Sequence, residues 1–209
     1  VTKWVAENGD QINVDGKKLA IVGNSAGGNM TIATSMKAKD NNGPEIKCQV
    51  LMWPYSNAST DAGSYTEYGE QRFLTTPLMK WMRDNYMATP EDFKNPLFSP
   101  AIAAKDQLKG LPPTLIEVAE NDILRDDGET LGRHLDEAGV YVTTIRFNGV
   151  THDWGLLNGF AELAPVQSLA LFTSAMLKKY LTKKSYKFLF RIPYQKTAYK
   201  SKWSTYCSS

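Results

Sequence analysis

The chain has 209 residues, enough for one sizeable domain, and 42% of them are apolar or aromatic, as in ordinary globular proteins. Seven of its 24 basic residues follow residue 182 and no acidic residue does, so residues 1–182 carry 17 basic and 22 acidic side chains. This acidic body argues against a nucleic-acid-binding surface. The lack of a long apolar run argues against a membrane span. Two cysteines, Cys48 and Cys207, are too few for a disulfide framework, and we expect a core thiol and a tail thiol.

Helix-like and strand-like patterns alternate along the chain. Helical spacing of apolar residues, short apolar runs and Gly or Pro signals set the boundaries. The predicted elements are a helix at 2–12, a strand at 19–22, a helix that follows residue 25 and fades at 39–44, a strand at 46–53, a polar loop at 55–76, a helix at 76–86, a long loop at 90–113, a strand at 114–119, a helix at 126–138, a strand at 141–147 and a helix at 165–181. This order predicts an α/β fold whose mostly parallel sheet carries helices on both faces.

The strand at 19–22 leads into Gly23-Asn24-Ser25-Ala26-Gly27, a G-x-S-x-G pattern that is typical of a nucleophilic serine. A serine hydroxyl reacts well only when the backbone holds it beside a base and amide groups face the developing oxyanion. Glycines on both sides permit a tight turn without a Cβ clash, and the Ala26 amide would be one oxyanion donor. The alternative is a glycine-rich turn with an incidental serine. The strand before it and the helix after it favour the nucleophile.

Two histidines are candidates for the base. His134 lies within the predicted helix at 126–138, where a surface or half-packed histidine is common. His152 lies in a loop just past the strand at 141–147, and α/β enzymes build their sites at the carboxyl ends of strands. Because histidine exchanges protons near neutral pH, we expect His152 to be the general base.

The base needs a carboxylate that orients it. Four carboxylates follow the strand at 114–119: Glu120, Asp122, Asp126 and Asp127. Asp122 is preferred because it directly follows the strand. Asp126 and Asp127 lie in a first helical turn, where carboxylates commonly complement the helix dipole. The chain order Ser25, Asp122, His152 is that of α/β-hydrolases.

These residues resemble the hormone-sensitive-lipase-like branch of the α/β-hydrolase esterases and lipases, over residues 1 to about 183. The segments that carry the resemblance are Gly23-Asn24-Ser25-Ala26-Gly27-Gly28, Asp122-Ile123-Leu124-Arg125-Asp126-Asp127-Gly128 and His152-Asp153-Trp154. The resemblance implies the α/β-hydrolase fold and, because the first aspartate of the middle segment is the acid in that branch, Asp122 in that role. Asn24 stands where the family often has aspartate.

The amino-terminal side departs from the family. Nothing before Gly23 resembles its His-Gly-Gly-Gly oxyanion loop, and the chain begins at Val1 rather than at a methionine. We therefore expect residues 1–182 to be the carboxy-terminal portion of a catalytic domain, with the amino-terminal strands and cap missing. Residues 183–209 form a basic tail without a family counterpart and are expected to be unstructured. A sequence error is favoured over a genuine tail that touches anionic lipid or nucleic acid.

The sequence predicts a serine carboxylesterase that hydrolyses short-chain acyl esters through a Ser-His-Asp triad and an acyl-enzyme. Aromatic and apolar residues near the predicted strand ends suggest a closed pocket: Phe73, Leu74, Trp81 and Trp154. Two alternatives stay open. A ligand-binding protein on the same fold would lose the base, which this chain retains as His152, and a serine peptidase of the prolyl-oligopeptidase type usually has a bulky aromatic residue in place of Ala26.

The expected partner is a small ester. No cofactor is expected, and no metal either, because no cluster of His, Cys and carboxylates has ligand spacing. No nucleic acid and no membrane span are expected. The oligomeric state and the compartment are left open, with a cytoplasmic location slightly favoured.

Overall fold

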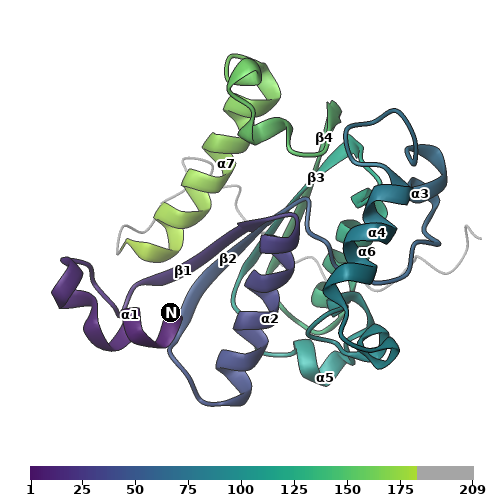
Figure 1. Ribbon diagram of the computed structural model, residues 1–209. Coiled ribbons are helices and arrows are strands. Elements are labelled where there is room, and N and C mark those ends of the chain that lie inside the picture. Colours follow the sequence, from purple (N-terminus) through teal and green to yellow (C-terminus); the bar gives the residue numbers. More distant parts are fainter. Residues whose placement is uncertain (183–209) are drawn as a thin grey trace, which may run out of the picture.

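A four-stranded parallel sheet lies at the centre of the computed structural model, which describes residues 1–182 (Figure 1). Its strands are β1 Leu19–Asn24, β2 Ile46–Met52, β3 Thr114–Asn121 and β4 Val142–Thr151. They lie in the order β1-β2-β3-β4, and each neighbouring pair is parallel. The predicted parallel α/β sheet is confirmed. The predictions about the basic tail and Cys207 concern residues 183–209, which lie outside the described residues.

Burial differs between the inner and outer strands. Most residues of β2 and β3 are buried, whereas those of β1 and β4 are mostly half-buried or exposed. Parallel strands with both faces covered are typically continuous apolar runs, and Val50, Leu51 and Met52 at the end of β2 fit this pattern. Because the strands are parallel, their carboxyl ends meet along one edge of the sheet, and this edge carries Ser25, Asp122 and His152.

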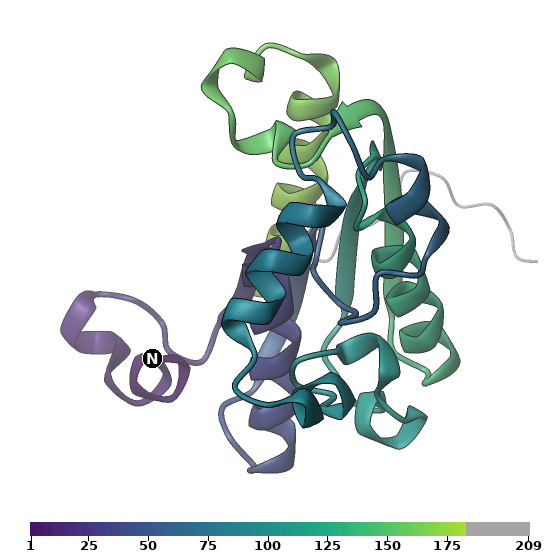
Figure 2. The same ribbon diagram turned by 45° about the vertical axis from the view of Figure 1, so that its right-hand side comes forward.

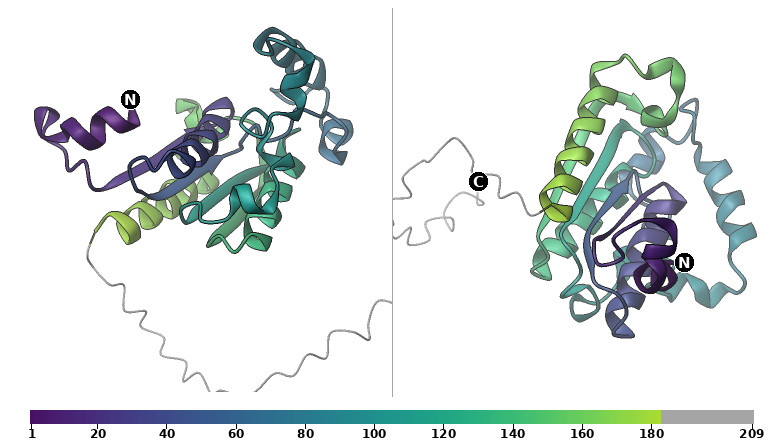
Figure 3. Two further views of the ribbon diagram at one scale, coloured as in Figure 1. Left: turned by 90° about the horizontal axis from the view of Figure 1, so that it is seen from below. Right: turned by 90° about the vertical axis from the view of Figure 1, so that its left-hand side faces the viewer.

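Helices cover both faces of the sheet (Figures 1 and 3). On one face, α2 Ala26–Asp40 packs on β1 and β2, and α6 Arg125–Glu137 packs on β3 and β4. On the other face lies α7 Ala164–Leu181. Pro165 lies in its first turn, where backbone N–H groups make no hydrogen bond within the helix, so the missing N–H of proline costs nothing there.

Short helices and 3-10 turns form the connections. They are α1 Thr2–Asn8, η1 Gly9–Ile12, α3 Gly63–Glu67, α4 Thr76–Tyr86, η2 Pro90–Lys94, η3 Pro100–Ile102, α5 Lys105–Leu108, η4 Trp154–Leu156 and η5 Asn158–Phe160. α1 has no buried residue, and it projects away from the rest of the chain in Figure 2. Within residues 1–182, no helix is both long and apolar enough to cross a membrane.

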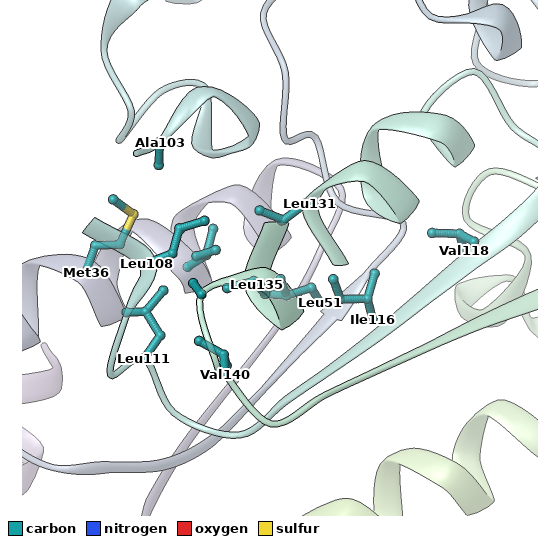
Figure 4. Close-up of a cluster of buried hydrophobic side chains, with 12 residues drawn as sticks. Met36, Leu51, Ala103, Leu108, Leu111, Ile116, Val118, Leu131, Leu135 and Val140 are labelled. Atoms are coloured by element: carbon teal, nitrogen blue, oxygen red, sulfur yellow. The ribbon is translucent and has the colours of Figure 1, made fainter. Parts of the chain in front are cut away.

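The largest buried cluster lies between the sheet and the helices α2 and α6 (Figure 4). Met36 enters it from α2, Leu51 and Ile116 from the two central strands, and Leu131 and Leu135 from α6. The two leucines are four residues apart and so share one face of α6. Both are fully buried, so truncating either to alanine would cost about 2–5 kcal/mol of stability.

A second buried cluster lies on the α7 side of the sheet, near the carboxyl ends of the strands. It contains Trp53, Phe147, Trp154 and Leu169, and the ring centroids of the two tryptophans are 4.5 Å apart. The cluster anchors the loop that follows β4, because Trp154 belongs to that loop.

Glu117 is a buried carboxyl group on this face of β3. Its Oε2 accepts a hydrogen bond of 3.0 Å from the Thr173 hydroxyl of α7, and its Oε1 has no partner among residues 1–182. Burial raises the pKa of Glu117 to about 7. The core is therefore less stable when this group is ionised than when it is protonated.

The structure corrects several predicted boundaries. The helix predicted at 2–12 is α1 followed by the 3-10 turn η1, and it ends at left-handed Asn13. The loop predicted at 55–76 contains the helix α3, and the loop predicted at 90–113 contains η2, η3 and α5. β4 continues past residue 147 to Thr151, because Thr151 pairs with Asn121 across a register shift in β3.

Candidate active site

Ser25 lies in the sharp turn between β1 and α2, with a φ of 52° and a ψ of −120°. Positive φ is costly for a residue with a side chain, so the surroundings must hold it. The Ser25 N–H donates to the Met52 carbonyl at 2.9 Å, and the Ser25 carbonyl accepts from the N–H groups of Gly28 at 3.0 Å and Tyr55 at 3.1 Å. The serine backbone is thus tied to the end of β2.

The two glycines of the motif differ in their steric role. A Cβ on Gly23 would lie 2.1 Å from the Gly27 carbonyl oxygen, so the turn requires glycine there. A Cβ on Gly27 would lie 3.9 Å from the nearest atom, Asn24 Oδ1, which is an ordinary contact. The sequence predicts that a Cβ at either glycine would clash. Among the described residues this is right for Gly23 and wrong for Gly27. Gly28 is the other glycine near Ser25 at which a side chain would clash, since a Cβ there would lie 2.8 Å from Pro54.

His152 lies between Ser25 and Asp122. Its Nε2 is 3.0 Å from Ser25 Oγ, and its Nδ1 is 2.7 Å from Asp122 Oδ2. The Leu124 N–H donates to the other oxygen of Asp122 at 3.0 Å and fixes the carboxylate. With the proton on Nδ1, the imidazole donates to Asp122 and can accept the serine proton at Nε2.

The His152 ring is enclosed by aromatic and acidic neighbours. It is 4% exposed and packs edge-on against Trp53, with ring centroids 6.3 Å apart. The Trp53 indole N–H donates to Asp153 Oδ1 at 2.8 Å, and this oxygen is 3.7 Å from His152 Nε2. Asp153 therefore brings a second carboxylate near the base, which sequence reasoning missed although Asp153 follows His152 directly.

The other candidate carboxylates have different hydrogen-bond donors. Glu120 accepts from the Gly149 N–H at 2.7 Å, and Asp126 accepts from the Ser64 N–H at 2.8 Å. Asp127 accepts from the Tyr65 hydroxyl at 3.0 Å, and burial raises its pKa to about 7. Asp122 is the one of the four that is hydrogen-bonded to His152 in residues 1–182.

His134, the other histidine, lies on α6. Its Nδ1 is 2.9 Å from the Ala101 carbonyl oxygen, a contact that links the helix to η3. The structure gives this ring a packing role and does not bring it to Ser25.

Ala26 is the first residue of α2. The first backbone N–H groups of a helix have no carbonyl partner within it, and the helix dipole favours negative charge beside them. The Ala26 N–H is thus well suited to an oxyanion next to Ser25, and that role stays a prediction.

An apolar cavity of about 600 Å³ opens beside Ser25 and His152. Its apolar walls come from α2, the segment 55–74, α4 and the segment between η2 and η3: Met30, Tyr55, Phe73, Leu74, Leu78, Met79, Met82, Tyr86 and Phe98. Arg83 and Asp153 are the charged residues that line it.

Two of the four predicted pocket residues line this cavity, Phe73 and Leu74. Trp81 does not, because it lies on the outer side of α4 with 64% of its surface exposed. Trp154 does not either, because it is buried in the cluster under the loop after β4. The predictions for Trp81 and Trp154 are therefore corrected.

The residues that sequence reasoning missed are mainly on α2 and α4. Met30 lies four positions after Ala26 in α2, so it shares a helix face with Ala26 and a helical projection identifies it. No such signal separates Met79 from the other apolar residues of α4. Among the described residues, no group of three or more His, Cys, Asp and Glu side chains is arranged to hold a metal ion.

Comparison with known proteins places these features in a family. The family model of the alpha/beta hydrolase fold matches residues 1–156. Ethyl acetate hydrolase of Pseudomonas putida is 32% identical over 163 residues, which cover 78% of this chain and 51% of the relative. An arylesterase of Saccharolobus solfataricus is 36% identical over 150 residues, which cover 71% of this chain and 48% of the relative.

Solved structures agree with the sequence comparisons. A thermostable esterase from Pseudomonas putida is 44% identical and superposes with a TM-score of 0.85, covering 88% of this chain and 57% of that structure. The chain spans about half the length of the curated relatives it matches. With the family model and these relatives in agreement, the chain belongs to the α/β-hydrolase fold family, in its hormone-sensitive-lipase-like branch.

Proposed function

We propose that this chain supplies Ser25, His152 and Asp122 as the catalytic triad of a serine carboxylesterase. The observation that supports this most strongly is the continuous row of hydrogen-bond contacts from Ser25 Oγ through both nitrogens of His152 to Asp122. The names of the relatives, an ethyl acetate hydrolase and an arylesterase, support ester hydrolysis as the reaction.

In the acylation step, Ser25 Oγ attacks the ester carbonyl carbon while His152 Nε2 takes the serine proton. The carbonyl oxygen becomes an oxyanion, which the Ala26 N–H stabilises at the start of α2. His152 then gives its proton to the leaving alkoxide, and an acyl-serine remains. Asp122 orients the imidazole throughout and stabilises its positive charge.

In the deacylation step, water replaces the alcohol. His152 removes a proton from the water as the oxygen attacks the acyl carbon, and then returns the proton to Ser25 as the carboxylic acid leaves. The same three residues serve both halves of the reaction, and no step needs a cofactor.

The proposed substrates are esters of short acyl chains. Phe73 and Leu74, together with the α4 side chains, give the cavity beside Ser25 an apolar wall of limited size. A cavity of about 600 Å³ is suited to a small ester.

The two alternatives are less well supported. A ligand-binding protein would have no need of a base at 3.0 Å from the serine hydroxyl. A peptidase of the prolyl-oligopeptidase type is disfavoured by Ala26 and the glycines that follow it, and by the esterase names of the relatives.

The experiment that tests the proposal is active-site labelling of the full-length protein with a fluorophosphonate. The probe should label Ser25, and Ser25→Ala should abolish both labelling and the hydrolysis of p-nitrophenyl butyrate. Ser35→Ala is the matched control, since Ser35 is a buried serine of α2, the helix that follows Ser25, and does not line the cavity. Hydrolysis that persists undiminished in Ser25→Ala would exclude Ser25 as the nucleophile.

A further inference from the structure

Arg125 is the first residue of α6 and lies three positions after Asp122. Its side chain is 11% exposed, yet it makes four hydrogen bonds. Nε donates to Asp126 Oδ1 at 2.8 Å, and Nη2 donates to Glu67 Oε2 at 3.0 Å. Nη1 donates to the Tyr68 hydroxyl at 3.1 Å and to the Glu120 carbonyl at 3.3 Å. The guanidinium thus joins the segment 120–126, which contains Asp122, to the end of α3.

The rest of α3 is bound to the same place. The Ser64 N–H donates to Asp126 Oδ2 at 2.8 Å, and the Ser64 hydroxyl donates to the Ile123 carbonyl at 2.6 Å. The Tyr65 hydroxyl donates to Asp127 at 3.0 Å. α3 therefore rests on the start of α6, beside which it lies in Figure 1.

α3 in turn holds the beginning of α4. The Thr76 hydroxyl donates to the Tyr65 carbonyl at 2.8 Å, and the Thr76 N–H donates to the Gly69 carbonyl at 2.9 Å. Gly69 permits this approach, because a Cβ there would lie 2.3 Å from the Tyr65 carbonyl oxygen. A chain of contacts thus runs from Arg125 through α3 to Thr76.

α4 depends on such attachments because it packs little against the body. Met79 is its one buried residue, and Arg83 adds a hydrogen bond of 3.2 Å to the Ala58 carbonyl. Leu78, Met82 and Tyr86 are exposed by 40%, 38% and 66%, yet all three line the cavity. The position of α4 therefore sets the width of the cavity.

We propose that Arg125 is a positioning residue that sets the width of the ester cavity by holding α3, and through it α4, against the loop of Asp122. This inference rests on the proposed esterase function for its consequence in catalysis. The inference gives Arg125 a role in substrate selection. A more mobile α4 would weaken the contacts between the cavity wall and the acyl chain, while Ser25, His152 and Asp122 would keep their geometry.

Hydrogen exchange tests the positioning directly and does not depend on activity. In full-length protein with Arg125→Met, deuterium uptake over residues 63–86 should rise roughly tenfold in rate, since charge-assisted hydrogen bonds to α3 are lost. Arg125→Lys should be intermediate, because a lysine keeps the charge but cannot bond Glu67, Tyr68 and Asp126 together. Arg133→Met is the matched control on the exposed side of α6, and its uptake over 63–86 should equal that of the wild type.

Kinetics test the consequence. With p-nitrophenyl esters, Arg125→Met should lower the ratio of kcat/KM for butyrate over acetate by roughly fivefold, chiefly through KM for butyrate. The rate for acetate should stay near that of the wild type. A merely structural role would lower both esters alike and leave the ratio unchanged.

Glu67→Lys provides a second variant in case Arg125→Met folds poorly. It reverses the charge of a residue whose side chain is 55% exposed and so disturbs the Arg125 contact without opening the core. It should show the same two effects at smaller size, whereas Glu70→Lys, at an exposed position nearby, should show neither.

Unchanged uptake over 63–86 in both Arg125→Met and Glu67→Lys overturns the proposal. Raised uptake with an unchanged butyrate-to-acetate ratio overturns the part that concerns selection. A wild type without esterase activity would count against the proposed function, and the deuterium uptake would still decide whether Arg125 positions α4.

Discussion

Ser25 Oγ lies 3.0 Å from His152 Nε2, although 127 positions separate the two residues in the chain. Within the described sheet they follow its two outer strands, β1 and β4, with β2 and β3 between them. Strands are spaced about 4.8 Å apart, so the His152 loop must reach back across the strand ends. Trp53, at the end of β2, packs against the His152 ring and supports it over that span.

Asp122→Asn should lower kcat by about 10⁴-fold, because an asparagine can hold the imidazole in the wrong tautomer. Asp126→Asn should instead reduce stability, since Asp126 is paired with Arg125 and the Ser64 N–H. Steady-state kinetics and thermal unfolding of both variants measure the two effects. The opposite ranking in rate would move the acid to Asp126.

Acyl-chain preference should follow the apolar cavity beside Ser25. p-Nitrophenyl acetate and butyrate should be hydrolysed with higher kcat/KM than the octanoate and longer esters, because the cavity of about 600 Å³ is walled by Phe73, Leu74 and α4. A series of p-nitrophenyl esters measures this. A kcat/KM that climbs steadily to the sixteen-carbon ester would contradict it.

Gly23→Ala should be strongly destabilising, by about 3 kcal/mol or more, because the new Cβ would lie 2.1 Å from the Gly27 carbonyl oxygen. Gly27→Ala adds a methyl group to the same turn at a distance of 3.9 Å and should fold normally. Urea unfolding of the two variants compares them directly. Equal stabilities of the two variants would show that the turn can relax around a Cβ at position 23 and would contradict the prediction.

Glu117 should make the stability of the protein fall as the pH rises from about 4.5 to about 7. Its pKa is raised by burial to about 7, so in this range the folded state holds a proton that the unfolded chain releases. Glu117→Gln removes the ionisation and should exceed the wild type at pH 8 by on the order of 3 kcal/mol.

Urea unfolding of wild type and Glu117→Gln at pH 5 and pH 8 measures this difference. Burial raises the pKa of Asp127 to about 7 as well, and it contributes equally to both proteins, so the comparison isolates Glu117. A stability difference that is the same at both pH values would refute the assignment.

Local signals in the sequence predict the strands and the turns that carry Ser25, Asp122 and His152. Each depends on a short apolar run and the Gly or polar residues that end it, and both are visible within about ten positions. α3 could not be predicted in this way. Its residues are polar, and its shape depends on contacts such as Ser64 with Asp126, 62 positions later.

The walls of the cavity show a similar limit. Apolar side chains occur on more than one side of α4, so the sequence does not reveal which side faces Ser25. The sequence favours Trp81 over Met79, although Met79 faces the cavity and Trp81 faces the solvent. The acid has a clearer local signal, because Asp122 directly follows β3 whereas Asp126 lies in the first turn of α6.

The backbone of Ser25 is held by Met52 and Tyr55, which belong to the exit of another strand. Protein engineers who graft a nucleophile into a new scaffold would therefore transfer too little if they moved residues 23–27 alone. The serine would arrive without the two cross-strand hydrogen bonds that keep its φ positive. A workable graft would carry both strand exits, including Pro54, whose ring fills the space that Gly28 leaves free.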